Sequence, residues 1–261
     1  MPVAGGLYYE EHGPAGGEPL ILSSGLGGSA GYWTPNLAAL AEHHRVIVYD
    51  HRGTGRSERI VAGDLTLEAM AQDLIGLMDA LAIRSATLIG HAIGGMIGLA
   101  LALKHPGRLS RVVVINGWAK LDPHTARCFD TRLVLLRESP RAFVHGQPIF
   151  LFPAQWISEH HDQLQAEEEV HLAHFPGVEM VQRRIAAARR FDIARRLNEI
   201  AVPVLLIATG DDMLVPASCS EQMVEQIPGA KLARMTSGGH AVNVTRPDHF
   251  NLWLLDWLDA E

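Results

Sequence analysis

The chain has 261 residues, of which 48% are hydrophobic and 20% charged, so it can bury the core of one large domain. A formal net charge of -7 argues against nucleic acid or an anionic membrane as the main partner. No signal peptide and no membrane-spanning apolar run is visible, and Cys128 and Cys219 form no disulfide framework. These features predict a cytoplasmic protein.

In chain order, short apolar strands alternate with helical segments. The predicted strands are Leu7–Glu11 (expected at a sheet edge), Pro19–Ser23, Arg45–Asp50, Thr87–Ile89, Arg111–Asn116, Val202–Ala208 and Ala230–Met235. The predicted helices cover 34–42 and 67–81, with others that begin at Ile93, end near Ile227 and begin near Pro247. Strands joined by helical crossovers form a mostly parallel sheet with helices on both faces, so we expect an α/β fold.

The alternation stops near Trp118, and the chain up to residue 198 has a helical pattern broken by prolines. We therefore expect an α/β core made of residues 1–117 and 199–261, with an inserted helical cap of residues 118–198. Apolar surface on the cap helices would suit a homodimer. The arginine-rich segment 182–196 has its apolar positions spaced for one helical face, so we expect its arginines to face solvent.

The segment Gly90-His-Ala-Ile-Gly94 lies between a buried strand and a helix rich in small residues. It has the form of a nucleophile elbow, G-x-S-x-G, with Ala92 at the position of the serine. Glycines suit this place because a sharp strand-to-helix turn leaves no room for side chains beside the central residue. The sequence thus predicts an elbow that lacks its hydroxyl.

Two further segments follow strands and would meet the elbow at the carboxyl edge of the sheet. The segment 209–216 contains Asp212, four residues before Pro216, with Asp211 as the neighbour that could be mistaken for it. The segment 238–243 contains His240. Taken singly, these residues could be a turn aspartate and a loop histidine, but the order of elbow, acid and histidine is that of a hydrolase triad.

The glycine-rich loop from Ser24 to Ser29, which includes Gly25, takes the place of the His-Gly loop that supplies an oxyanion donor. By position, the backbone N–H groups of Leu26 and Ile93 would face a reacting carbonyl. The loop does not open a helix of a dinucleotide-binding unit, so we expect no nicotinamide or flavin. The fourteen histidines include no H-E-x-x-H and no cysteine partner, so we expect no metal or other cofactor.

Several longer motifs carry a family resemblance. They are Ser24-Gly-Leu-Gly-Gly28, Tyr49-Asp-His-Arg-Gly-Thr-Gly55, the elbow, Asn116-Gly-Trp118, His124-Thr-Ala-Arg-Cys-Phe129, Leu172-Ala-His-Phe175, Asp211-Asp-Met-Leu-Val-Pro216 with Cys219, and Gly239-His-Ala-Val-Asn-Val-Thr245. With these motifs the whole chain resembles the α/β-hydrolase superfamily, and most closely the aminoacrylate or carbamate hydrolases of the Rut pathway of pyrimidine degradation. That branch carries alanine at the elbow, so Ala92 agrees with it.

The resemblance implies a hydrolase that acts on C–N bonds other than peptide bonds, in uracil degradation and nitrogen metabolism, with a small-molecule substrate and water. Loss of the serine alone costs a serine protease about six orders of magnitude in rate. We therefore expect His240, oriented by Asp212, to activate water on a substrate that is already labile, such as aminoacrylate or carbamate. Two alternatives remain: a non-catalytic ligand-binding homologue, and a serine hydrolase whose nucleophile was mutated.

Overall fold

A computed structural model describes residues 2–260, and its centre is an eight-stranded sheet of order β1-β2-β4-β3-β5-β6-β7-β8. The strands are β1 (Val3–Ala4), β2 (Leu7–His12), β3 (Pro19–Ser23), β4 (Arg45–Tyr49), β5 (Ala86–His91), β6 (Leu109–Ile115), β7 (Val204–Thr209) and β8 (Lys231–Met235). The β1–β2 and β2–β4 pairs are antiparallel, and the later neighbours are parallel. The predicted mostly parallel α/β sheet is confirmed.

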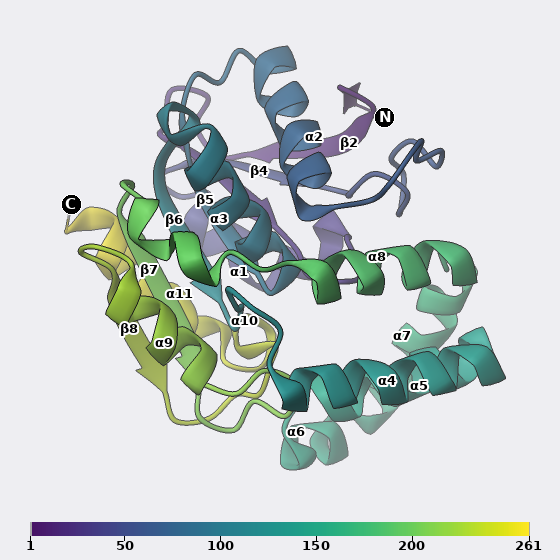
Figure 1. The fold of residues 1–261 in the computed structure, drawn as a ribbon. Helices are drawn as coiled ribbons and strands as arrows, with labels where there is room; N and C mark the ends of the chain where they lie inside the picture. The colour runs from purple at the N-terminus through teal and green to yellow at the C-terminus, as the bar shows by residue number, and fades with distance from the viewer. Residues whose placement is uncertain (1, 261) are drawn as a thin grey trace.

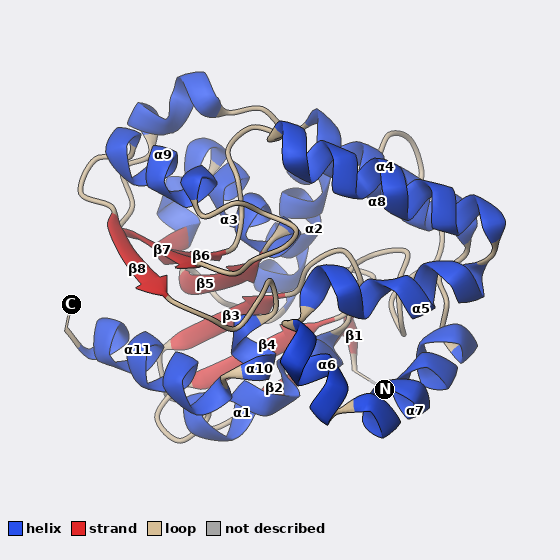
Figure 2. Cartoon of the chain, turned by 90° about the horizontal axis from the view of Figure 1, so that it is seen from below, coloured by secondary structure: helices blue, strands red, loops and turns tan. Residues whose placement is uncertain are grey.

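Helices cover both faces of this sheet (Figure 2). The core helices are α1 (Thr34–Leu40), α2 (Leu67–Ala80), α3 (Ile93–Lys104), α9 (Ser218–Gln226), α10 (Val242–Thr245) and α11 (Pro247–Asp259). Because successive strand residues point to opposite faces, Val112 and Val114 of β6 enter the core beneath α2 and α3, whereas Val113 and Ile115 enter the core beneath α1 and α11. Burial on both sides explains why the central strands are continuous apolar runs.

The helical insertion lies between β6 and β7 and projects to one side of the sheet (Figure 1). It contains α4 (Pro123–Glu138), α5 (Pro140–Leu151), α6 (Ala154–Glu159), α7 (His161–Ala173) and α8 (Val178–Arg190), and we call these helices the cap. Local sequence explains where two of them begin. Asp122 and Ser139 each directly precede the proline that begins the helix, α4 and α5 respectively. Their side chains accept hydrogen bonds from backbone N–H groups in the first turn of that helix.

Two sequence expectations are wrong in detail. Strand β2 is not at the edge of the sheet, because β1 pairs with its outer side. The sequence does not reveal β1, because a strand of only two residues has no recognisable periodicity. The arginines of segment 182–196 do not all face solvent, because Arg184 is only 1% exposed. Among the helices of residues 2–260, none has the length and apolarity that a membrane crossing requires.

Candidate active site

The elbow turns at Ala92, between the end of β5 and the start of α3. Ala92 has φ 48° and ψ -110°, a left-handed conformation that a residue with a side chain rarely adopts, and its N–H donates to Ile115 O at 2.8 Å. A Cβ at Gly90 would lie 2.2 Å from the carbonyl carbon of Gly94, and one at Gly94 would lie 2.0 Å from Ser23 O. The strained turn is therefore present although its central side chain is a methyl group.

His240 and Asp212 come together in the loops that follow β8 and β7. The Nδ1 atom of His240 donates to Oδ2 of Asp212 at 2.8 Å, and the two side chains are 2% and 0% exposed. The other carboxylate oxygen of Asp212 accepts the backbone N–H groups of Leu214 (2.7 Å) and Val215 (3.0 Å). Because Nδ1 carries the proton of this bond, a neutral His240 has a bare Nε2 that can accept one.

The neighbouring acid has different partners. The carboxylate of Asp211 accepts the backbone N–H groups of Gly239 (2.8 Å) and Gly238 (3.2 Å) in the loop that leads to His240. Asp211 therefore shapes this loop, whereas Asp212 contacts the imidazole ring. Of the two aspartates, the structure places Asp212 beside His240, as the sequence predicts.

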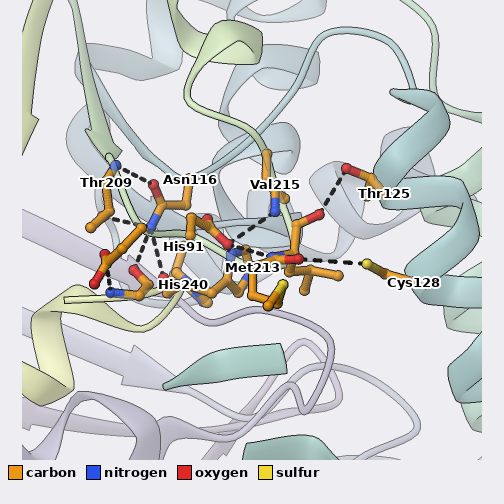
Figure 3. A network of polar contacts seen from close by, with 12 residues as sticks. His91, Asn116, Thr125, Cys128, Thr209, Met213, Val215 and His240 are labelled. Carbon is orange, nitrogen blue, oxygen red and sulfur yellow. Dashed lines mark hydrogen bonds and ion pairs between the residues drawn. The ribbon is translucent and has the colours of Figure 1, made fainter. Parts of the chain in front are cut away.

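The backbone of His240 is held by residues that the sequence reasoning missed (Figure 3). The amide Nδ2 of Asn116 donates to His240 O at 2.8 Å and also lies near Gly239 O (3.3 Å) and Thr209 Oγ1 (3.1 Å), and its Oδ1 accepts the N–H of Thr209. Nε2 of His91 donates to the same His240 carbonyl at 2.9 Å. Asn116 directly follows β6 at the edge where the elbow, acid and histidine loops meet, which is the signal that could have identified it.

His91 lies between the ring of Tyr32, at a centroid distance of 4.9 Å, and the ring of His240, at 4.6 Å. Burial and the neighbouring His240 hold the pKa of His91 well below its usual value. A carbonyl oxygen only accepts, so the single proton of His91 is on Nε2, and Nδ1 is bare with no hydrogen-bond partner within residues 2–260. His91 is thus a neutral imidazole and adds no positive charge beside His240.

The glycine-rich loop lies next to the elbow because β3 and β5 are neighbours, with Ser23 in register with Gly90. The N–H of Gly28 donates to Gly25 O at 3.1 Å and closes a turn. Within residues 2–260, the N–H groups of Leu26 and Ile93 donate to no other backbone or side-chain atom. Ser24 is 2% exposed, and its hydroxyl likewise has no partner in the described chain.

The buried Arg184 of α8 contacts the other side of this loop. Its Nε donates to Leu26 O at 2.7 Å, and its Nη2 donates to Gly25 O at 3.1 Å and to Nδ1 of His51 at 2.9 Å. Burial lowers the pKa of Arg184 to about 10, so the guanidinium stays charged at neutral pH. Burial and Arg184 together hold the pKa of His51 well below its usual value.

The cap reaches the acid loop through α4. Thr125 Oγ1 donates to Leu214 O at 2.9 Å, and the Cys128 thiol lies 3.6 Å from Met213 O (Figure 3). Burial raises the pKa of Cys128, which keeps it a thiol at neutral pH. Residues 2–260 contain no cluster of three or more His, Cys, Asp or Glu side chains that could hold a metal ion.

Comparisons with known proteins identify the fold and the family of this chain. Residues 18–133 match the family model described as "alpha/beta hydrolase fold". The chain is 51% identical over 259 residues, 98% of its length and 97% of the relative's, to a Caulobacter segnis protein named "Putative carbamate hydrolase RutD". The solved structure of a hydrolase from Pseudomonas aeruginosa is 30% identical with a TM-score of 0.87, covering 97% of this chain and 94% of that one.

The enol-lactonase from Burkholderia xenovorans is also similar in structure, with 28% identity, a TM-score of 0.87, and coverage of 97% of this chain and 96% of that one. The fold similarity confirms the expected architecture, and the full-length relatives confirm the narrower resemblance. The chain therefore belongs to the RutD family of hydrolases with the α/β-hydrolase fold.

Proposed function

We propose that this chain hydrolyses a small, labile, amine-bearing acid of pyrimidine breakdown, carbamate or aminoacrylate, by direct attack of water. The observation that carries the proposal is the buried His240–Asp212 pair beside an elbow whose central residue, Ala92, has no nucleophile. The RutD relatives, whose name refers to carbamate, support the substrate class.

For carbamate, the proton transfers balance as follows. Nε2 of His240 takes a proton from water while the water oxygen bonds to the carbamate carbon, and Asp212 stabilises the resulting imidazolium. The N–H groups of Leu26 and Ile93 donate to the oxygen on which negative charge develops. His240 then returns its proton to the nitrogen, the C–N bond breaks, and ammonia and bicarbonate are formed.

For aminoacrylate, His240 takes a proton from water while the water oxygen bonds to the carbon of the imine tautomer, and it returns this proton to the imine nitrogen to give a carbinolamine. His240 then takes the proton of the carbinolamine hydroxyl and passes it to the nitrogen; the C–N bond breaks, ammonia leaves and an aldehyde acid remains. Here the free N–H groups of Leu26 and Ile93 would hold the substrate carboxylate instead of a developing oxyanion. Both routes use the same two groups of this site, a general base and a pair of donors.

The expected rate enhancement suits a labile substrate. General acid–base catalysis contributes roughly 10²–10⁴-fold and an oxyanion donor roughly 10²–10³-fold, together about 10⁴–10⁷-fold. Without a covalent intermediate, this rate enhancement is too small to hydrolyse a stable amide at a useful rate. It is large enough for a compound that already hydrolyses unaided. The absence of a hydroxyl at Ala92 is thus compatible with useful catalysis.

The test measures ammonia release from freshly generated aminoacrylate and from carbamate, each corrected for the spontaneous reaction. The intact chain should accelerate at least one of them, and His240→Ala should abolish the acceleration. His174→Ala, a change at an exposed histidine of the cap, is the control and should leave the rate unchanged. Equal rates for the intact chain and His240→Ala would reject the proposal, and tight binding of either compound without turnover would favour a binding protein.

A further inference from the structure

Three carbonyl groups of the glycine-rich loop, those of Gly25, Leu26 and Gly28, accept hydrogen bonds from other groups of the protein. Gly25 O accepts from Gly28 N and from Arg184 Nη2, and Leu26 O accepts from Arg184 Nε. Gly28 O accepts from the N–H of His51 at 2.8 Å and from Oγ1 of Thr54 at 2.9 Å. Arg184 thus fixes the orientation of two consecutive peptide groups, Gly25–Leu26 and Leu26–Gly27.

Peptide geometry carries this orientation to the opposite side of the loop. In a planar trans peptide the N–H points away from the C=O. Since Gly25 O points to the guanidinium of Arg184, the N–H of Leu26 points away from it. A Cβ at Gly25 would lie 2.9 Å from Nδ1 of His91, so the loop packs directly against the elbow, beside the residue that precedes Ala92.

The charge of Arg184 has no carboxylate partner among residues 2–260 and is 1% exposed, and its Nη1 has no hydrogen-bond acceptor there. Burying an uncompensated cation costs several kcal/mol, which is uncommon without a role. A cation bound to a carbonyl draws electron density from that peptide group. The N–H on its other end becomes a stronger donor because linked hydrogen bonds polarise one another.

A buried polar chain holds the guanidinium in place. An arginine only donates, so Nδ1 of His51 accepts from Arg184 and its proton lies on Nε2, which contacts Ser23 Oγ at 3.3 Å. Ser23 Oγ in turn lies 2.7 Å from Oη of Tyr49. These three partners come from the core, whereas Arg184 comes from the cap, so the contact joins the two parts of the molecule.

We propose that Arg184 is a positioning residue of the reaction: from cap helix α8 it aims the N–H of Leu26 toward the elbow and strengthens it as a donor. The catalytic consequence rests on the proposed function, because only a reaction that develops charge or holds a carboxylate beside Leu26 uses this donor. The structural consequence, a polarised and oriented Leu26 amide, does not depend on which substrate is used.

The experiment compares Arg184→Met, Arg184→Lys and the matched control Arg183→Met. Arg183 lies on the same helix and also donates to backbone carbonyls, those of Val61 and Gly63 in another loop. For the better substrate, Arg184→Met should lower kcat by about 10–100-fold with KM changed less than threefold, since loss of a whole oxyanion donor costs about 10²–10³-fold. Arg184→Lys should recover part of kcat, and Arg183→Met should leave both constants near those of the intact chain.

Amide NMR gives a readout that needs no turnover. In Arg184→Met the amide proton resonance of Leu26 should move upfield, because its N–H is no longer polarised through Gly25 O, whereas that of Ile93 should change little. If Arg184→Met does not fold, the same signals are measured in Arg184→Lys, and the Nε–H of Arg184 is measured in the intact chain, where it should exchange slowly. An unaltered Leu26 amide in a folded variant, or a rapidly exchanging Arg184 Nε–H, would overturn the proposal. No turnover by the intact chain together with the expected amide changes would reject only the proposed function.

Discussion

Replacement of Asp212 by asparagine tests the central pair with almost no change in shape. Oδ1 of Asp212 accepts two backbone N–H groups, and an asparagine oxygen can keep both of these bonds. Its NH₂ group would then face Nδ1 of His240 and donate to it, where the carboxylate accepts. The imidazole would be forced into the opposite tautomer, with its proton on Nε2, and would no longer be a base toward water.

The expected loss is the whole contribution of the general base. That contribution is roughly 10²–10⁴-fold, or about 2.7–5.4 kcal/mol of activation free energy at 1.36 kcal/mol per tenfold. In a serine protease the corresponding change costs about 10⁴-fold through the same change of tautomer. We therefore expect kcat/KM of Asp212→Asn to fall at least 100-fold, while the midpoint of urea unfolding changes little.

The assay is ammonia release at pH 7 for the intact chain, Asp212→Asn and Asp211→Asn. The Asp211 variant is the matched control, because this adjacent carboxylate contacts Gly238 and Gly239 but not the imidazole ring. It should lose much less activity than Asp212→Asn. If Asp212→Asn retained a rate within threefold of the intact chain, or if the two variants lost equal activity, the assigned role of the pair would be wrong.

Three further outcomes are expected. Burial holds the pKa values of His51 and His91 well below 6.5, so below pH 6.5 the unfolded state binds more protons than the folded state. The free energy of unfolding should therefore decrease as the pH falls, with a slope that approaches about 1.4 kcal/mol per pH unit for each histidine. His91→Gln should remove the contribution of His91 to this decrease, measured by urea unfolding at pH 5 and pH 7. Ala92→Ser should give a burst of nitrophenolate from p-nitrophenyl acetate, because the elbow is already formed; no burst would mean that the new hydroxyl does not reach His240. Asn116→Ala removes the acceptor of the Thr209 N–H and one of the two donors to the His240 carbonyl. It should lower the free energy of unfolding by about 1–3 kcal/mol in urea, whereas a loss below about 0.5 kcal/mol would contradict its role.

Much of the architecture could be predicted because its signals are local. The continuous apolar runs of the central strands and the glycines of the elbow each have one structural interpretation, and the topology follows from the right-handed crossover rule. The positions of Asp212 and His240 could be predicted because each comes directly after a strand, and parallel strands end at the same edge of the sheet.

Contacts that join distant segments could not be predicted in the same way. Arg184 lies on the buried face of α8 with Val181, Ile185 and Ala188, so the periodicity marks it as buried, but its charge favoured a solvated position. What overrides that preference is a set of acceptors, two loop carbonyls and the ring of His51, that lie more than 130 residues away in the chain. Single-sequence patterns do not reveal such a partner.

The anchoring of α8 also limits how substrates can enter. If the cap swung outward as a rigid lid, Arg184 would lose three hydrogen bonds made by a charged group, each contributing about 1.5–3 kcal/mol. Such an opening would be rarely populated, so traffic to the interior would depend on brief local fluctuations of side chains and loops. Such a route favours small molecules over large ones, so access to the site would select substrates by size in addition to the chemistry within it.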